Sequence, residues 1–105
     1  STGRGEENIR VAGAHTVVEQ MRRGAHPREA CLEALRRVVR NFDNDQNKLA
    51  QVGLLFYALR KDGEHAGASL WSQTDREGRL RAPRYVVNDG GESRFAEAAY
   101  LLQRK

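Results

Sequence analysis

The sequence predicts a single α+β unit in which two helices come first and several strands follow. Residues 6–42 repeat apolar side chains at helical spacing, whereas residues 52–102 alternate short apolar runs with glycine-containing turns. The length of 105 residues suits one compact domain. Helices grouped before strands are typical of a layer of helices that covers one face of a sheet.

The first helix is expected over residues 6–23. Glu6 and Glu7 begin it, because acidic side chains in the first turn stabilise the positive end of the helix dipole. Gly24 ends it, since glycine readily takes the left-handed conformation that follows a helix. An apolar face of about 120° of arc at 3.6 residues per turn makes this helix amphipathic. That face carries Val11, Ala14, Val17, Val18 and Met21.

The second helix is expected to begin near Pro27, because proline suits the first helical position, and to run antiparallel to the first. Its apolar face carries Cys31, Ala34, Leu35, Val38 and Phe42. A polar loop over residues 41–48 follows this helix. The helix pair therefore occupies residues 6–42.

Val52–Leu59 is a continuous apolar run of strand length, the pattern of a strand that is buried on both faces. Lys61–Glu64 contains an Asp-Gly pair, which predicts a hairpin turn into a return strand over His65–Trp71. Two helices can cover only one face of such a sheet. The sequence therefore predicts that chain segments outside these 105 residues cover the second face.

The remaining residues predict a loop and shorter strands. Ser72–Ala82 is expected to be a charged loop, Tyr85–Val87 a short strand, and Asn88–Gly91 a turn. Arg94–Leu102 is ambiguous, because its composition favours a helix whereas its place after a turn allows a strand.

The charges indicate solvated faces more than a nucleic-acid interface. Lysine and arginine number 18 against 14 aspartate and glutamate, a net charge of +4, and the two signs are interspersed along the chain. No apolar run approaches the roughly 18 residues of a membrane span, and no signal peptide is recognisable. We expect no nucleic-acid and no membrane partner, and a soluble protein that is cytoplasmic or periplasmic if bacterial.

Cysteine and histidine offer no metal or cofactor site. The single cysteine, Cys31, excludes an internal disulfide and a Cys-based zinc site, and its place on an apolar helix face predicts a small buried hydrophobe. His15, His26 and His65 lie far apart and lack the spacing of metal ligands. We therefore expect neither a metal nor a cofactor.

A Thr-Gly-x-Gly-Glu segment at residues 2–6 carries the main chemical signal. Glycines at the start of a helix let the backbone approach a ligand, and the free N–H groups there stabilise negative charge. The hydroxyl of Thr2 beside the N–H of Gly3 would make a sensible oxyanion hole for acyl transfer. The alternative is a tight turn that caps a helix.

Three motifs stand in the first 31 residues: S-T-G-x-G-E at residues 1–6, M-x-x-G at residues 21–24 and P-x-x-A-C at residues 27–31. With these motifs the chain resembles the glycosylasparaginases, within the isoaspartyl peptidase and asparaginase family of N-terminal nucleophile hydrolases. The resemblance continues through Gln51-Val52-Gly53 and the strand at Tyr85 to Tyr100.

The resemblance implies an αββα four-layer sandwich, with the helix pair as one outer layer on an antiparallel sheet and a strand near Tyr100. It implies an amidase that cleaves the side-chain amide of asparagine-type substrates through an acyl-enzyme on an N-terminal threonine. That threonine is freed when a precursor cleaves itself into α and β subunits. Thr2 and Gly3 would form the oxyanion hole, and Gly3 and Gly5 would bind substrate.

The nucleophilic threonine of the family, and the arginine and aspartate that hold its substrate, precede the matching region. By resemblance, residues 1–105 are the C-terminal portion of a β subunit: an oxyanion turn at 1–5, the helix pair, and strands over 51–102. Its partners would be the α subunit and the rest of the β subunit in an αβ or (αβ)2 assembly, with a small amide as substrate. Alone, the chain is expected to be inactive. The alternative is a catalytically inactive α+β module for binding or assembly, with a basic nucleic-acid module as the third hypothesis.

Overall fold

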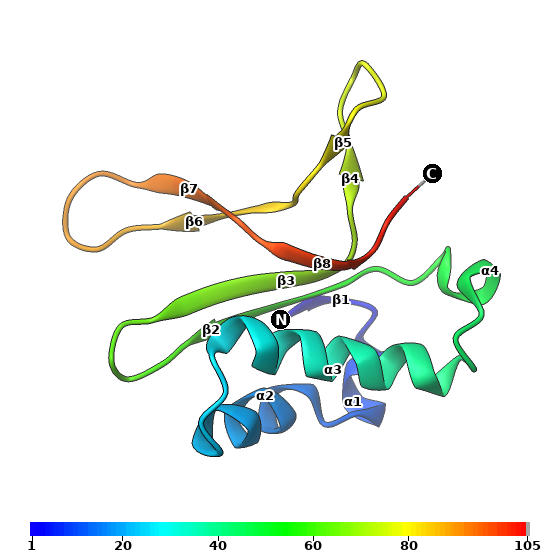
Figure 1. Ribbon diagram of the computed structural model, residues 1–105, viewed down its shortest axis with the longest axis horizontal. Coiled ribbons are helices and arrows are strands. Elements are labelled where there is room, and N and C mark those ends of the chain that lie inside the picture. Colours follow the sequence, from blue (N-terminus) through cyan, green and yellow to red (C-terminus); the bar gives the residue numbers. More distant parts are fainter. Residues whose placement is uncertain (105) are drawn as a thin grey trace.

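The computed structural model describes residues 1–104 as a layer of helices against one face of a mixed sheet (Figure 1). Two small hairpins lie on the side of the sheet opposite the helices. The α+β class predicted from the sequence is confirmed at this level. None of the helices among these residues is long and apolar enough to cross a membrane.

The chain runs from a short strand through the helices into the strands, in the following order. The elements are β1 (Thr2–Gly3), α1 (Gly5–Arg10), α2 (Gly13–Arg22), α3 (Pro27–Asn41), α4 (Gln46–Leu49), β2 (Leu54–Leu59), β3 (His65–Trp71), β4 (Gln73–Thr74), β5 (Leu80–Arg81), β6 (Arg84–Val87), β7 (Arg94–Glu97) and β8 (Ala99–Leu102).

The main sheet has the strand order β1-β2-β3-β8 and is not wholly antiparallel, which corrects the expected antiparallel sheet. β1 and β3 both run antiparallel to β2, but β8 runs parallel to β3, with Ala68 opposite Ala99. The physical reason is the connection between β3 and β8. The chain leaves β3, forms both small hairpins and returns, and a parallel neighbour needs such a long crossover.

The single helix expected over residues 6–23 is instead two helices that break at Ala12. Ala12 has a left-handed backbone with φ 48°, and the hydroxyl of Thr16 donates at 2.7 Å to the Val11 carbonyl that the break leaves free. Gly13 then approaches the core so closely that a Cβ there would lie 2.6 Å from the ring of Phe56. Tertiary packing at glycine therefore overrides the local preference for one continuous helix.

The break also changes which side chains of the first helical region are buried. Val11 and Val17 are buried and Met21 is half-buried, as predicted, but Ala14 and Val18 are exposed. The buried residues of α2 are Gly13, Thr16 and Val17. The expected apolar face was wrong at two positions because α2 starts anew after Ala12.

Helix α3 begins at Pro27, as predicted, and supplies most of the core. The N-cap residue His26 accepts a hydrogen bond from the N–H of Arg28, which satisfies a donor of the first turn. The predicted core residues Cys31, Ala34, Leu35 and Val38 are all buried, and Phe42 is half-buried against them. These side chains pack α3 onto β2, β3 and β8.

The expected loop over residues 41–48 contains the beginning of a short helix, α4. Asp45 caps it by accepting hydrogen bonds from the N–H groups of Asn47 and Lys48. Its last residue, Leu49, is buried, and the Leu49 carbonyl accepts a hydrogen bond of 3.1 Å from the Trp71 indole. The sequence missed α4 because a single turn is held by its cap and by one tertiary contact.

Strand β2 alternates between a covered and an open face. Leu54, Phe56 and Ala58 are buried under the helices, whereas Tyr57 is 44% exposed and Leu59 is 72% exposed. The sequence predicted a strand buried on both faces, with the helices on one face and segments outside these 105 residues on the other. Within residues 1–104, this second face of β2 is left largely open.

The predicted hairpin at Lys61–Glu64 is confirmed, and Gly63 supplies its left-handed residue with φ 95°. β3 occupies His65–Trp71 as predicted. Ser72–Ala82 is not a loop but contains the hairpin β4–β5, in which Gln73 is opposite Arg81. Arg94–Leu102 contains two strands, β7 and β8, so the strand implied near Tyr100 is confirmed against its helical composition.

Candidate functional site

The strand β1 lies at the edge of the sheet and consists of Thr2 and Gly3. The backbone N–H of Arg4, the next residue, donates to the Gly53 carbonyl at 2.7 Å. This bond makes Arg4 and Gly53 a hydrogen-bonded pair of the antiparallel ladder. Hydrogen-bonded and non-hydrogen-bonded pairs alternate along such a ladder, so the next pair, Gly3 and Leu54, is not hydrogen-bonded. The N–H of Gly3 therefore points away from β2, toward the free edge of the sheet.

Gly3 occupies a position that only glycine fits. Its φ of 123° lies in the left-handed region, and a Cβ on this residue would overlap the carbonyl oxygen of Gly53. The close approach of Gly3 to Gly53 sets the distance of β1 from β2. The strand that carries the predicted oxyanion residues is thus fixed by backbone contact rather than by side-chain packing.

The side chain of Thr2 lies on the open face of the sheet. Thr2 is opposite Leu55, and residues directly opposite each other in a ladder place their side chains on the same face. Leu55 alternates with Leu54 and Phe56, which face the helices. The exposed Thr2 hydroxyl and the outward N–H of Gly3 are therefore two donors beside the open face at one edge.

Helix α1 begins directly after this segment, at Gly5. The first N–H groups of a helix have no partner within the helix, so they are free to meet a negatively charged or polar group. A Cβ at Gly5 would meet no atom within 4 Å among the described residues. The three predicted site residues, Thr2, Gly3 and Gly5, are thus brought together at a strand-to-helix junction.

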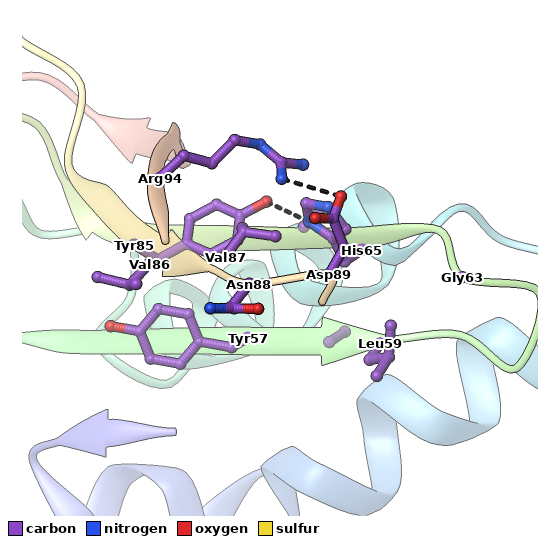
Figure 2. Close-up of a pocket in the computed structure, with 12 residues that line it drawn as sticks. Tyr57, Leu59, Gly63, His65, Tyr85, Val86, Val87, Asn88, Asp89 and Arg94 are labelled. Atoms are coloured by element: carbon purple, nitrogen blue, oxygen red, sulfur yellow. Dashed lines mark hydrogen bonds and ion pairs between the residues drawn. The ribbon is translucent and has the colours of Figure 1, made fainter. Parts of the chain in front are cut away.

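A separate cleft of about 600 Å³ lies between β2–β3 and the hairpin β6–β7 (Figure 2). Tyr57 and Leu59 form its apolar side, and the hydroxyl of Tyr85 lies 2.8 Å from the Nδ1 atom of His65. Partial burial raises the pKa of Tyr85. A Cβ on Gly67 would lie 3.1 Å from the Tyr85 ring, so this glycine lets the hairpin rest on β3.

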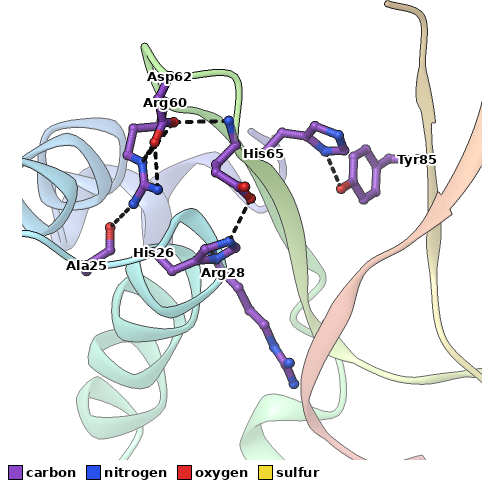
Figure 3. Close-up of polar contacts among 8 residues, drawn as sticks. Ala25, His26, Arg28, Arg60, Asp62, His65 and Tyr85 are labelled. Atoms are coloured by element: carbon purple, nitrogen blue, oxygen red, sulfur yellow. Dashed lines mark hydrogen bonds and ion pairs between the residues drawn. The ribbon is translucent and has the colours of Figure 1, made fainter.

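A second polar cluster holds the tip of the β2–β3 hairpin against the start of α3 (Figure 3). Arg60 pairs with Asp62 at 2.9 Å, and the Arg60 guanidinium keeps the pKa of Asp62 below its usual value. Glu64 lies 3.2 Å from the Nε2 atom of His26. These contacts fix the turn against the start of α3, and His26 also lines a small cleft of about 310 Å³ together with Arg28 and His65.

Cys31 is wholly buried in α3, and burial raises the pKa of its thiol to about 11. A thiol with that pKa stays protonated near neutral pH and is a poor nucleophile. Among residues 1–104, no cluster of three or more His, Cys, Asp or Glu side chains gathers that could hold a metal ion. The edge segment at residues 2–5 therefore remains the candidate site.

Two curated proteins from distant organisms are similar to this chain. N(4)-(Beta-N-acetylglucosaminyl)-L-asparaginase from Elizabethkingia miricola is 36% identical over 93 residues, which cover 83% of this chain and 27% of that enzyme. A probable isoaspartyl peptidase/L-asparaginase 3 from Arabidopsis thaliana is 38% identical over 68 residues, 65% of this chain and 17% of that protein. No family model matches the sequence.

Both relatives are named as asparaginases, so that is the class of protein to which the chain is similar. Within that class, it belongs to the family of glycosylasparaginases and isoaspartyl peptidase/asparaginases, and the predicted resemblance is confirmed. The chain spans about a quarter of the length of the bacterial relative and less of the plant one.

Sequence reasoning named Thr2, Gly3 and Gly5 as candidate site residues, but it missed side chains that contact this segment. Asn8 and Gly13 were placed on an ordinary helix, yet the amide of Asn8 donates to the Ser1 hydroxyl at 2.8 Å. A Cβ on Gly13 would overlap the side-chain oxygen of Asn8. No local signal marks these contacts, because they depend on the helix break at Ala12.

Proposed function

We propose that this chain is the part of an asparagine-type amidohydrolase that supplies the oxyanion hole. Attack of a nucleophile on a side-chain amide puts negative charge on the carbonyl oxygen, and fixed hydrogen-bond donors stabilise that charge. Thr2 donates through its hydroxyl and Gly3 through its backbone N–H. Gly5, at the start of α1, binds the substrate beside them.

The single observation that carries the proposal is the direction of the Gly3 N–H. The hydrogen bond from Arg4 to Gly53 leaves the Gly3 N–H pointing off the free edge of β1. The Thr2 side chain lies on the open face next to it. Two donors near one point, without a partner from β2, are what an oxyanion needs.

The other catalytic groups belong to the rest of the enzyme. A threonine at the N-terminus of the β subunit attacks the amide, forms an acyl-enzyme and releases the amine, and water then releases aspartate. An arginine and an aspartate from the same upstream region hold the substrate's α-carboxylate and α-amino groups. On this basis, the 105 residues alone are inactive, and substrate is bound only in the αβ or (αβ)2 assembly.

The same assembly completes the fold. A second sheet, packed on the open face of β2, would turn the observed helix and sheet layers into an αββα sandwich. Exposed Tyr57 and Leu59 are apolar or amphipathic side chains that such a layer would bury. This cover also excludes water from the two donors, which makes their hydrogen bonds to an oxyanion stronger.

The test uses the full-length enzyme that contains this chain, with asparagine, a β-aspartyl dipeptide and glycosylasparagine as substrates. Thr2→Ala should lower kcat about 10²- to 10³-fold on the preferred substrate, the loss typical of a missing oxyanion donor. Thr2→Ser keeps the hydroxyl and should retain most of the rate. If the wild-type enzyme cleaves none of the three substrates, the proposal is wrong and the chain is better explained as a binding or assembly module.

A further inference from the structure

We infer that Asn8 is a positioning residue for the oxyanion segment. This inference rests on the proposed function of Thr2 and Gly3. Asn8 lies in α1, outside the Thr-Gly-x-Gly segment, and does not itself offer an atom to the reacting carbonyl. Its role would be to hold the two donors in one orientation.

Asn8 contacts both residues that flank the donor pair. Its side-chain amide donates to the Ser1 hydroxyl at 2.8 Å, and its backbone N–H donates to the Arg4 carbonyl at 3.3 Å. Ser1 precedes Thr2, and Arg4 follows Gly3. Asn8 is thus hydrogen-bonded to the residues on both sides of the dipeptide Thr2–Gly3, which carries the two donors.

The side chain of Asn8 is itself held in place. Gly13 packs so closely that a Cβ there would overlap the Asn8 side-chain oxygen, and it would also lie 2.6 Å from the Phe56 ring. Phe56 is only 2% exposed, and its neighbour in β2, Leu55, is opposite Thr2. The half-buried side chain of Asn8 therefore lies beside Gly13, the residue that packs on the buried Phe56 ring.

Strand β1 needs a restraint of this kind because of its position in the sheet. β1 has only two residues and lies at the edge of the sheet, where few ladder hydrogen bonds restrain the backbone. An oxyanion donor stabilises the transition state only if its orientation is set before the reaction. A bond from α1 to Ser1 restrains the strand at the end opposite the Arg4–Gly53 hydrogen bond.

The experiment is a double-mutant cycle in the full-length enzyme, with Asn8→Ala, Ser1→Ala and the two combined. Each single change should lower kcat between about twofold and tenfold, the value of one neutral hydrogen bond, with KM nearly unchanged. The combined variant should lose no more than the worse single variant, because both remove one interaction. Losses that multiply, or a change in KM alone, would overturn the inference.

Two matched controls separate positioning from folding. Ser1→Thr keeps the hydroxyl that accepts the Asn8 bond and should restore kcat relative to Ser1→Ala. Asn47→Ala makes the same substitution at an exposed asparagine of α4 and should leave kcat unchanged. If Asn8→Ala fails to fold, the comparison of Ser1→Ala with Ser1→Thr still decides the inference, and equal rates would overturn it.

Failure of this inference is distinguishable from failure of the proposed function. If Thr2→Ala abolishes most of the rate while Asn8→Ala and Ser1→Ala have wild-type rates, the oxyanion hole stands and Asn8 is not a positioning residue. If Thr2→Ala retains the wild-type rate, the proposed oxyanion hole itself is wrong, and the inference is wrong with it.

Discussion

The two faces of strand β2 differ sharply in their surroundings. Phe56 is 2% exposed beneath the helices, whereas its neighbour Tyr57 is 44% exposed on the other face. The covered face is closed by α3, and the open face carries the Thr2 side chain at its edge. The comparison teaches that the described residues cover one face of the strand and leave the other, beside which the proposed oxyanion donors lie, largely open.

The largest expected effect is on the covered face. Phe56→Ala should lower the free energy of unfolding of the full-length enzyme by about 3–5 kcal/mol, because a large ring leaves a cavity beside α3 and Gly13. Urea denaturation measures it. A loss below about 1 kcal/mol would show that this face is not the core.

The matched change on the open face sharpens the same comparison. Tyr57→Ala should cost about 1 kcal/mol or less if only the β6–β7 hairpin and water lie over this face. In the full-length enzyme we expect a cost of about 3 kcal/mol or more, because a second layer would bury the ring. Urea denaturation of the two variants side by side decides whether the open face is covered.

Gly3→Ala tests the edge that joins the two faces. The added Cβ would overlap the Gly53 carbonyl oxygen, so β1 must shift away from β2. Because the shift moves both donors and the added Cβ strains the backbone at this φ, we expect kcat to fall about 10²-fold or more and the unfolding midpoint to fall as well. A steady-state assay together with thermal unfolding measures both. An active variant with normal kcat would contradict the proposed site.

Tyr85→Phe tests the hairpin that rests on the sheet. The change removes the hydroxyl that bonds His65 at 2.8 Å but keeps the ring packed over Gly67. We expect a loss of about 1 kcal/mol of unfolding free energy. A much larger loss in urea denaturation would mean that the hydroxyl also bonds a segment outside the described residues.

The smallest expected effect is on the outer surface of the helix layer. The Arg22 guanidinium lowers the pKa of Glu19 to about 2, so this pair stabilises the folded state when Glu19 is ionised. The contribution is fully present above the ordinary pKa of about 4.5 and is lost as the pH falls toward about 2. The stability difference between wild type and Glu19→Gln should shrink over that range, as measured by chemical denaturation.

The sequence predicted the elements whose signals are local. α3 begins at Pro27 and buries the expected face around Leu35, and β3 follows the Asp-Gly turn with the predicted bounds. The spacing of apolar residues, a proline at a helix start and glycines in turns determine local structure within a few residues. The elements that depend on them can therefore be predicted from a single sequence. Thr2 and Gly3 were also singled out from their types and order, and their role as oxyanion donors stays a prediction.

Features decided by distant contacts were not predictable in this way. The break at Ala12 exists because Gly13 packs on Phe56, more than forty residues away in the chain. The parallel pairing of β8 with β3 depends on the return path of the hairpins between them. Asn8 was missed for the same reason, since its contact with Ser1 appears only once α1 folds back on β1.

The hydrogen bond from Arg4 to Gly53 has a consequence for how the site can vary. Because pairs alternate along the ladder, a shift of β1 by one residue would turn the Gly3 N–H inward and the Thr2 side chain toward the helices. Whether these two groups can act as donors therefore depends on their register along β1 as well as on their residue types. A shift of β1 by one residue along β2 should therefore abolish the proposed site even though it leaves every side chain intact.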